Sequence, residues 1–193
     1  MDVIGRGAEA TITKTAKGVV KSREKKAYRH EDLDTRLRQF RTRREAKVLS
    51  HLRELAPRVF SVDDVDMLIE MEFVDGAMLR DVLTEENVHS WMKKLAKTIQ
   101  QMHSVGVVHG DLTSSNVLVR GEELVLIDFG LSEFSDHVEH VAVDLHLLKQ
   151  SLAAKHPQFP CWEVFWEEYG PGEELVERFT VVESRGRYKG KNA

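Results

Sequence analysis

The sequence predicts an α+β protein of two lobes, with a small β-rich lobe containing one long helix and a second, mostly helical lobe. Two observations predict this fold class. Most strand-like runs lie before residue 74 and are interrupted by a single long helix pattern. After residue 130 the periodicity is that of helices. At 193 residues the chain has the length of one large domain or of two small lobes.

The small lobe is expected to contain a hairpin, a long helix and two further strands. Its strands are predicted where β-branched and aliphatic residues gather, at 10–15, 18–22, 58–63 and 66–73. The first two strands are joined by an Ala-Lys-Gly turn, as in a β-hairpin. A helix is predicted from Glu31 or Asp32 to Ala56, because Pro57 cannot continue it.

The second lobe is expected to begin after a connector near residues 72–76. Its first helix, over 87–104, has one apolar stripe formed by Val88, Trp91, Met92, Leu95, Ile99 and Met102. Two short strands follow, at 116–119 and 123–128, around a Gly-Glu-Glu turn. Three helices are predicted after them, at 138–154, 159–169 and 173–182. We therefore predict a first lobe over 1–73, a second over 74–183 and a basic C-terminal tail over 184–193.

Composition and charge restrict the class of protein and its surroundings. The chain is 41% hydrophobic and 31% charged, as soluble globular proteins are. Its single cysteine, Cys161, excludes an internal disulfide. We find neither a signal peptide nor an apolar run of about 18 residues, and expect a cytoplasmic or nuclear protein without membrane association. Residues 21–44 hold ten Lys or Arg and four Asp or Glu, so this segment is positively charged. Such a charge indicates either an anionic partner or a helix face exposed to solvent.

The first candidate functional residues lie in the small lobe. In IGRGAEATI, Gly5 and Gly7 have the spacing of a glycine-rich loop whose backbone amides approach phosphates, although a hairpin turn needs glycines too. Lys21 ends a strand and could be a phosphate ligand or a solvent-facing lysine. Glu45 decides between these, because it shares a helical stripe with Leu49, where a carboxylate needs a partner. We therefore predict a Lys21–Glu45 ion pair.

A second group follows from HGDLTSSN, residues 109–116, in a loop between two short strands. The spacing of Asp111 and Asn116 suits a carboxylate that orients a hydroxyl beside an amide that ligates a metal. In LVLIDFGLS a buried strand leads to Asp128, and the intervening hairpin returns this residue to the same end as Asn116. Oxygen ligands of this kind suit Mg²⁺, which keeps waters and substrate phosphates as its other ligands.

In this order and spacing, the motifs resemble those of the protein kinase fold. The resemblance implies that Lys21 contacts the α- and β-phosphates of ATP and pairs with Glu45. It makes Asp111 the residue that accepts or orients the substrate hydroxyl. It also implies that Asn116 and Asp128 hold Mg²⁺, for which Mn²⁺ could substitute.

A nucleotide-binding hinge is implied by MLIEMEFVDG, residues 67–76. It resembles the kinase segment between the lobes, with Met71 as the gatekeeper. The backbone from Glu72 to Val74 would then face the adenine, and the loop containing Gly5 and Gly7 would cover the phosphates.

The same motifs also depart from those of most protein kinases. Gly110 stands where most protein kinases have an arginine that responds to phosphorylation of the activation segment by binding it. Thr113 stands where a lysine usually faces the γ-phosphate. No Ala-Pro-Glu follows Asp128. Instead VEHVAVDLHLL follows almost at once, and its Asp144 resembles the buried aspartate of a later kinase helix. We therefore expect a reduced second lobe without a full activation segment.

One small kinase family resembles the chain over nearly its whole length. The similarity lies in HGDLTSSN, LIDFGLS, EHVAVDLHLL, the helix with LDTRL and RTRREAKVL, and the terminal Arg-Gly-Arg. These stretches resemble the atypical, RIO-like serine/threonine kinase or ATPase subunit of the KEOPS complex, which supports N6-threonylcarbamoylation of adenosine 37 in tRNA. The resemblance implies contact of the second lobe and tail with the catalytic subunit, a small subunit on the first lobe, and tRNA nearby.

Three other kinds of protein share some of these motifs. A stand-alone RIO-type kinase usually lacks a clean Asp-Phe-Gly, and small-molecule kinases of the aminoglycoside and choline type usually have a larger helical lobe. A non-catalytic kinase-like scaffold would not need Asp111 or Asp128. The acceptor, whether water, a Ser/Thr protein or the chain itself, does not follow from the sequence.

Overall fold

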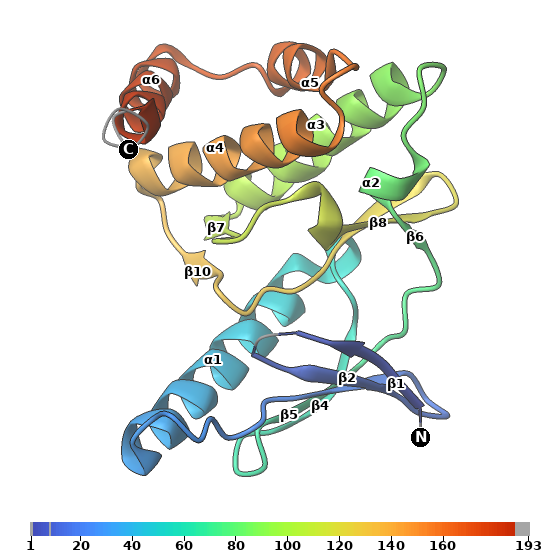
Figure 1. Ribbon diagram of the computed structural model, residues 1–193, viewed down its shortest axis with the longest axis vertical. Coiled ribbons are helices and arrows are strands. Elements are labelled where there is room, and N and C mark those ends of the chain that lie inside the picture. The colour runs from blue at the N-terminus through green and yellow to red at the C-terminus, as the bar shows by residue number, and fades with distance from the viewer. Residues whose placement is uncertain (1, 8, 188–193) are drawn as a thin grey trace.

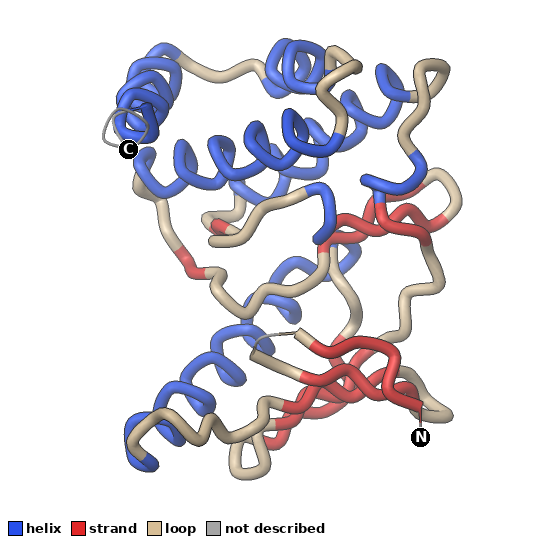
Figure 2. The backbone as a smooth tube through the Cα atoms, viewed as in Figure 1, coloured by secondary structure: helices blue, strands red, loops and turns tan. Residues whose placement is uncertain are grey.

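The computed structural model describes residues 2–7 and 9–187, arranged in two lobes. The lower lobe in Figure 1 holds a five-stranded sheet and one long helix, whereas most helices lie in the upper lobe (Figure 2). The sheet is antiparallel in the order β1-β2-β3-β5-β4. Its strands are β1 (Asp2–Arg6), β2 (Thr11–Lys14), β3 (Val19–Ser22), β4 (Val59–Asp63) and β5 (Leu68–Met71).

Strand β1 is an element that the sequence does not predict as a separate strand. Glycine lowers strand propensity, and β1 contains Gly5 at a β-bulge that follows Val3. The strand forms at the sheet edge by pairing with β2. The glycine-rich turn therefore connects two neighbouring strands.

Helix α1 (Glu31–Leu52) carries the buried side chains Ala46, Val48 and Leu49 on the face that packs in the core. It ends four residues before the predicted Ala56. Arg53 adopts a left-handed backbone with a φ of 47°, and a short 3-10 turn over Arg53–Leu55 follows. A local change of backbone conformation thus ends the α-helix before the proline does.

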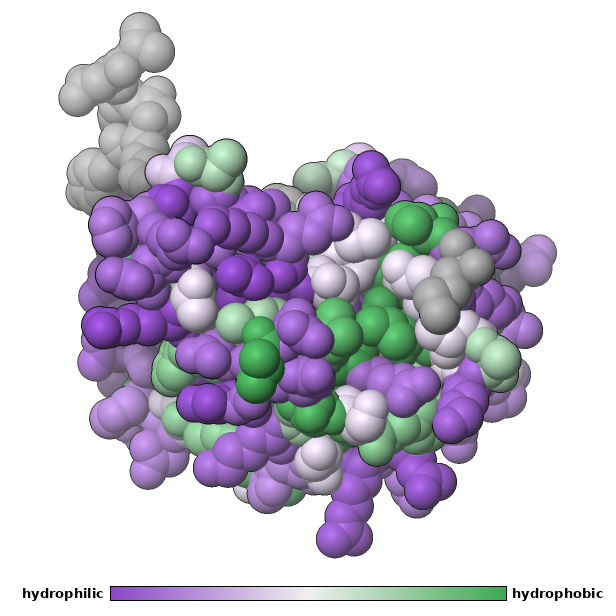
Figure 3. Space-filling model, turned by 90° about the horizontal axis from the view of Figure 1, so that it is seen from below, coloured by the Kyte–Doolittle hydropathy of each residue, from purple (hydrophilic) through white to green (hydrophobic). Residues whose placement is uncertain are grey.

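The outer surface of the small lobe carries apolar side chains. Figure 3 shows them gathered on the face seen from below, with hydrophilic residues around them. Strand β1 exposes Val3, and β4, at the opposite edge of the sheet, exposes Phe60 and Val62. Within residues 2–7 and 9–187, no helix is both long and apolar enough to cross a membrane.

In the described part of the chain, the second lobe contains five α-helices, one short 3-10 turn and strand segments that frame the loop at 109–116. Its strands are β6 (Ala77–Met78), β7 (Val107–Val108), β8 (Val117–Arg120), β9 (Glu123–Leu126) and β10 (Glu133–Phe134), and they form the sheets β6-β8-β9 and β10-β7. Its helices are α2 (Leu79–Val82), α3 (Val88–Ser104), α4 (Val138–Lys155), α5 (Cys161–Tyr169) and α6 (Glu173–Arg187), and the 3-10 turn is Ser114–Asn116. The predicted lobe boundary at 73 to 74 falls between β5 and β6.

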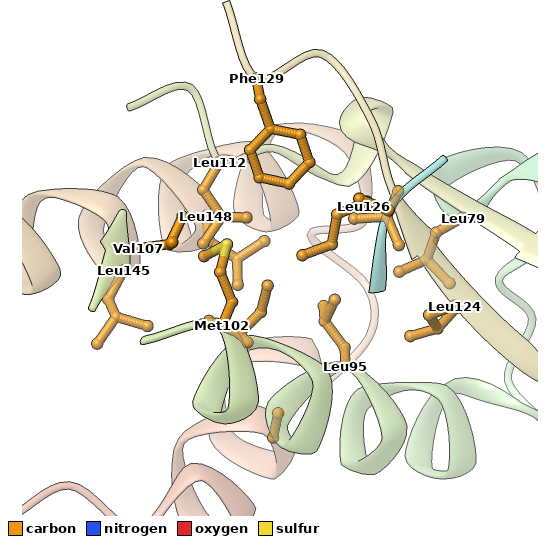
Figure 4. Close-up of a cluster of buried hydrophobic side chains, with 14 of the residues drawn as sticks. Leu79, Leu95, Met102, Val107, Leu112, Leu124, Leu126, Phe129, Leu145 and Leu148 are labelled. Atoms are coloured by element: carbon orange, nitrogen blue, oxygen red, sulfur yellow. The ribbon is translucent and has the colours of Figure 1, made fainter. Parts of the chain in front are cut away.

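The core of the second lobe lies beneath the functional loops. The predicted apolar stripe of α3 is present, and all its members except the half-buried Trp91 are buried. Leu95 and Met102 from this stripe share one hydrophobic cluster with Leu112 and Phe129 (Figure 4). Leu112 and Phe129 adjoin Asp111 and Asp128 in sequence, so packing in this core fixes both loops.

The C-terminal boundary differs from the prediction. Helix α6 continues to Arg187, five residues beyond the expected end, so the tail predicted from residue 184 starts four residues too early. The guanidinium of Arg185 pairs with Glu139 of α4, and Lys149 Nζ lies 2.6 Å from Glu183 Oε1. These ion pairs join α6 to α4 and extend the helix. Residues 188–193 of the predicted tail lie outside the described residues.

Candidate active site

A cavity of about 780 Å³ lies between the lobes, and every residue predicted for the site lines it. The small lobe contributes Gly5, Gly7, Lys21 and Glu45, the connecting segment contributes Met71, Glu72 and Val74, and the second lobe contributes Asp111, Asn116 and Asp128. Residues separated by more than 100 positions in sequence thus meet in one cavity. The predicted set is spatially coherent.

One end of the cavity is apolar and adjoins the connecting segment. Ile12 and Val19 line it from the small lobe, and Leu118 and Ile127 line it from the second lobe. The Glu72 N–H donates to the carbonyl oxygen of Arg58 (2.8 Å), which continues the β4–β5 pairing toward the connector. A flat apolar group therefore has hydrophobic walls on both sides and backbone at its edge.

A second hollow, of about 970 Å³, lies behind the connecting segment. Its walls are largely charged and come from the end of α1, from α3 and from the β8–β9 turn. Of the predicted site residues it includes only Glu72, whose carboxylate accepts a hydrogen bond from Arg120 Nη1 (2.8 Å). The Glu72 side chain thus belongs to this hollow, and we do not assign a site to it.

The charged end of the cavity is organised by Lys21. Its Nζ donates to Glu45 Oε1 (2.6 Å) and to Asp128 Oδ1 (2.7 Å). The predicted Lys21–Glu45 ion pair is therefore present, and the lysine also reaches the Asp-Phe-Gly turn. Lys21 and Glu45 are both buried, whereas 55% of the Asp128 side chain is exposed. The lysine joins β3, α1 and the segment after β9.

The Asp128 carboxylate is held in its ionised form. Partial burial alone would raise its pKa, but the charge and hydrogen bond of Lys21 outweigh this and lower the pKa. Its backbone has a φ of 63°, a left-handed conformation that Asp tolerates better than most residues. The Phe129 side chain next to it is fully buried. This backbone conformation lets Phe129 enter the core while Asp128 faces the cavity.

Asp111 and Asn116 lie together on the opposite wall. Asn116 Nδ2 donates to the Asp111 backbone oxygen (2.8 Å) and to its Oδ2 (3.2 Å). The Ile127 N–H donates to the Asn116 backbone oxygen (2.9 Å), which holds the end of β9 beside this loop. As predicted, the β8–β9 hairpin returns Asp128 to the same end as Asn116. With both amide hydrogens directed at Asp111, the Asn116 side-chain oxygen is the atom available to a ligand.

His109 and Asp144 fix the backbone of the loop. Asp144 Oδ1 accepts from the Gly110 N–H (2.8 Å), and its Oδ2 accepts from the His109 N–H. His109 Nε2 lies 3.0 Å from the Ile127 carbonyl oxygen, and its Nδ1 accepts from the Asp111 N–H (3.3 Å). Complete burial lowers the pKa of His109, so the imidazole stays neutral with its proton on Nε2.

The loop also explains why glycine replaces arginine at position 110. Gly110 has a φ of +78°, and a Cβ added to it would lie 2.4 Å from the Leu131 carbonyl oxygen. Only residues 129–137 separate Asp128 from α4, so the segment runs close to this loop. Arg44 Nη1 of α1 donates to the Ser132 carbonyl oxygen (2.9 Å). The shortened segment is held by α1 and packs where a larger residue would stand.

Comparisons with known proteins agree with this geometry. The family model described as protein kinase domain matches residues 1–149. The KEOPS complex subunit Bud32 of Pyrococcus abyssi is 36% identical, and the match covers 98% of this chain and 97% of that protein. The chain belongs to the Bud32 family of protein kinases. This confirms the family predicted from the sequence motifs.

Longer relatives contain a Bud32-like part. A probable bifunctional tRNA threonylcarbamoyladenosine biosynthesis protein of Halobacterium salinarum is 39% identical over 97% of this chain. A similarly named protein of Methanobrevibacter smithii is 37% identical. The chain spans only 36% and 37% of the length of these two relatives. The Bud32 family therefore includes stand-alone chains and parts of longer ones.

Solved structures confirm the predicted bilobal kinase fold. The Rio2 kinase of Chaetomium thermophilum superimposes with a TM-score of 0.64, at 17% identity, over 97% of this chain and 72% of that one. Its ADP/Mg²⁺-phosphoaspartate complex gives a TM-score of 0.60, at 17% identity, over 96% and 70%. Identity this low shows the fold alone. It is the Bud32 relative, at 36% identity, that decides the family.

In this Bud32-family chain, the sequence-based prediction missed Arg23. Its Nη2 pairs with Glu45 Oε2, so Glu45 bridges two buried cations. The Arg23 guanidinium also lies beside Gly130, since a Cβ added there would be 3.1 Å from Nη2. The sequence does contain a signal that Arg23 lies near Glu45. Residues two apart on a strand share a face, and Arg23 follows Lys21 by two positions.

Proposed function

We propose that the chain is an Mg²⁺- and ATP-dependent phosphotransferase or ATPase that supports N6-threonylcarbamoyladenosine formation in tRNA as a KEOPS subunit. The observation that carries the proposal is the double contact of Lys21 with Glu45 and Asp128. A protein kinase needs this lysine–glutamate pair and this aspartate in place to act on ATP. The names of the Bud32-family relatives support the biological role.

The cavity suits a nucleotide in size and in polarity. Its volume of about 780 Å³ lies within the range of small-molecule sites. We infer that adenine occupies the apolar end between Val19 and Leu118, against the backbone from Glu72 to Val74. The phosphates then extend toward Lys21. The glycine-rich loop covers them with backbone amides.

The residues present fit a magnesium ion. Asp128 and Asn116 offer hard oxygen ligands on the cavity wall, and Lys21 occupies only one oxygen of Asp128. Among the described residues no group of three or more His, Cys, Asp or Glu could hold a metal. Two protein ligands plus phosphate oxygens and waters are what Mg²⁺ accepts, and Mn²⁺ should substitute. The ion would neutralise developing charge on the phosphate oxygens.

We infer that Asp111 orients the attacking hydroxyl of water or of a Ser/Thr side chain. Its Oδ2 is held by Asn116, which fixes the carboxylate toward the cavity. Thr113 supplies no cation to the γ-phosphate, and removing one such group typically costs a few kcal/mol of transition-state stabilisation. The nine-residue stretch 129–137 leaves little surface for docking a peptide. Both features favour slow basal turnover that depends on a partner.

The direct test is release of the γ-phosphate from Mg²⁺-ATP, measured with and without the tRNA-modifying catalytic subunit and tRNA. Phosphorylated residues are then mapped, which separates ATP hydrolysis from Ser/Thr phosphorylation. Asp128→Ala should abolish metal-dependent nucleotide binding. Asp111→Ala should keep binding and lower turnover by ~10²-fold or more. The matched control is Asp136→Ala, an exposed aspartate on the same segment. Wild-type turnover in both site variants would overturn the proposal.

A contact with the catalytic subunit through the second lobe and the chain end is also proposed. Because Arg185 of α6 is bound by Glu139 of α4, a truncation from residue 184 would damage the fold. The sharper variant removes residues 188–193 only. It should retain basal turnover and lose stimulation by the catalytic subunit. Unchanged stimulation would exclude these six residues from the contact. A small subunit on the first lobe is proposed as well, and the exposed apolar side chains Phe60 and Val62 of β4 support it.

A further inference from the structure

Glu9 makes a contact that the kinase motifs do not explain. It lies in the glycine-rich turn between β1 and β2, where the Gly7 N–H donates to the Ala10 carbonyl oxygen (2.9 Å). Its Oε1 accepts from Arg29 Nη2 (3.1 Å), and its Oε2 lies 2.7 Å from Arg41 Nη1. One carboxylate at the tip of the turn therefore binds two arginines from elsewhere in the small lobe.

These arginines are themselves part of helix α1 and its entry. Arg29 precedes the helix and also lies 3.6 Å from Asp34 Oδ1, and Asp34 is fully buried. The second oxygen of Asp34 accepts from Arg38 Nε (2.7 Å). Arg41 lies one turn beyond, within α1. The network thus runs from the glycine-rich turn across the first half of α1.

The network also reaches the kinase ion pair. Arg41 precedes Glu45 by four residues, so the two side chains lie on the same face of α1, one turn apart. Glu9, Arg41 and Glu45 all line the nucleotide cavity. A shift of the glycine-rich turn would therefore displace Arg41 and the turn of α1 next to Glu45.

Helix α1 requires a contact of this kind to hold its position. In most protein kinases an activation segment helps to position this helix, through the arginine that Gly110 replaces here. The segment after Asp128 is short, and its backbone packs against Gly110. An anion from the glycine-rich turn can hold α1 in addition to that segment, which contacts the helix through Arg44 and Ser132.

We propose that Glu9 is a positioning residue that latches the glycine-rich turn to helix α1 through Arg29 and Arg41. The position of the turn beside the nucleotide cavity and the placement of Glu45 are then coupled. The nucleotide part of this proposal rests on the proposed function. The latch itself does not, because its ion pairs join protein side chains only. The structural link, between the turn and α1, can therefore be tested separately from the catalytic link, between this contact and nucleotide binding or turnover.

Hydrogen–deuterium exchange of the full chain without nucleotide tests the structural link. The variant is Glu9→Gln, which keeps the size of the side chain and removes its charge. Exchange should rise both in residues 5–12 and in residues 31–45. The matched control is Arg43→Gln, since Arg43 lies on the same helix but pairs with Asp64 and is 63% exposed. Unchanged exchange in α1 would overturn the latch even if the turn itself loosened.

Nucleotide affinity and turnover test the catalytic link. Glu9→Gln and Arg41→Gln should each lower the affinity for Mg²⁺-ATP or the turnover by about 3- to 10-fold, and the double variant should be no worse than either single one. Arg41→Lys, which keeps the charge, should recover most of the loss. Additive losses would show independent roles and refute the coupling. If the wild-type chain fails to bind Mg²⁺-ATP, the proposed function fails, while the exchange experiment still decides the latch.

Discussion

Glu45 is predicted to matter more for stability than Lys21, although the two form one ion pair. Replacing Lys21 by Ala leaves the Glu45 carboxylate with Arg23, whose Nη2 binds its other oxygen. Replacing Glu45 by Ala leaves Lys21 and Arg23 buried beside each other, and only Lys21 retains a carboxylate partner, Asp128. The two substitutions are therefore unequal.

The magnitudes follow from burial. Glu45 is 1% exposed, and removing the partner of a buried charge typically costs ~3–5 kcal/mol. Glu45→Ala should accordingly lower the melting temperature by about 6–20 °C for a domain of this size. Lys21→Ala should cost ~1.5–3 kcal/mol, the value of a hydrogen bond to a charged group. The Lys21 substitution should nevertheless remove nucleotide binding.

Urea unfolding and Mg²⁺-ATP binding, measured on the same preparations, check this difference. Lys25→Ala is the control, because the Lys25–Glu31 pair is exposed and solvent screens it, so its loss should hardly change stability. If Lys21→Ala destabilised the fold as much as Glu45→Ala, Arg23 would not compensate for the lost lysine. Normal nucleotide binding by Lys21→Ala would refute its placement on the phosphates.

Three further predictions use single residues as probes. Gly110→Ala should destabilise the fold and loosen the segment at Leu131, because the added Cβ would clash with the Leu131 carbonyl oxygen. Gly121 has a φ of +59° and open space around it, so Gly121→Ala should cost only the ~1–2 kcal/mol of a left-handed backbone. Equal losses of stability in urea unfolding would contradict the clash at Gly110. Because the pKa of His109 is lowered on folding from its ordinary 6.5, the unfolded chain binds the proton first, and stability should fall as the pH drops below that value. His109→Gln should flatten this pH dependence of urea unfolding, and an unchanged slope would assign it to other groups. Burial raises the pKa of the Cys161 thiol to about 11, so thiol reagents at pH 8 should label it only on unfolding, and rapid native labelling would contradict its burial.

The sequence by itself determined the elements whose signals are local. The apolar stripe of α3 and the hairpin from 117 to 126 follow from periodicity and turn residues within a short window, and both are present. Glu45 was identified in the same way, because a carboxylate on an apolar helical stripe requires a buried cation. The order of the motifs then sufficed to indicate the kinase fold.

Beyond the predicted Lys21–Glu45 pair, only the tertiary structure decided which charged groups meet. Lys21 reaches Asp128 across 107 positions of sequence, and Arg23 shares Glu45 with it. The partners of Glu9 and the need for glycine at 110 likewise depend on segments that approach from elsewhere in the chain. Local patterns report which side chains must be buried, since burial follows the period of the helix or strand. They do not report the whole set of charges around a buried group, because long side chains can reach several partners and packing selects among these.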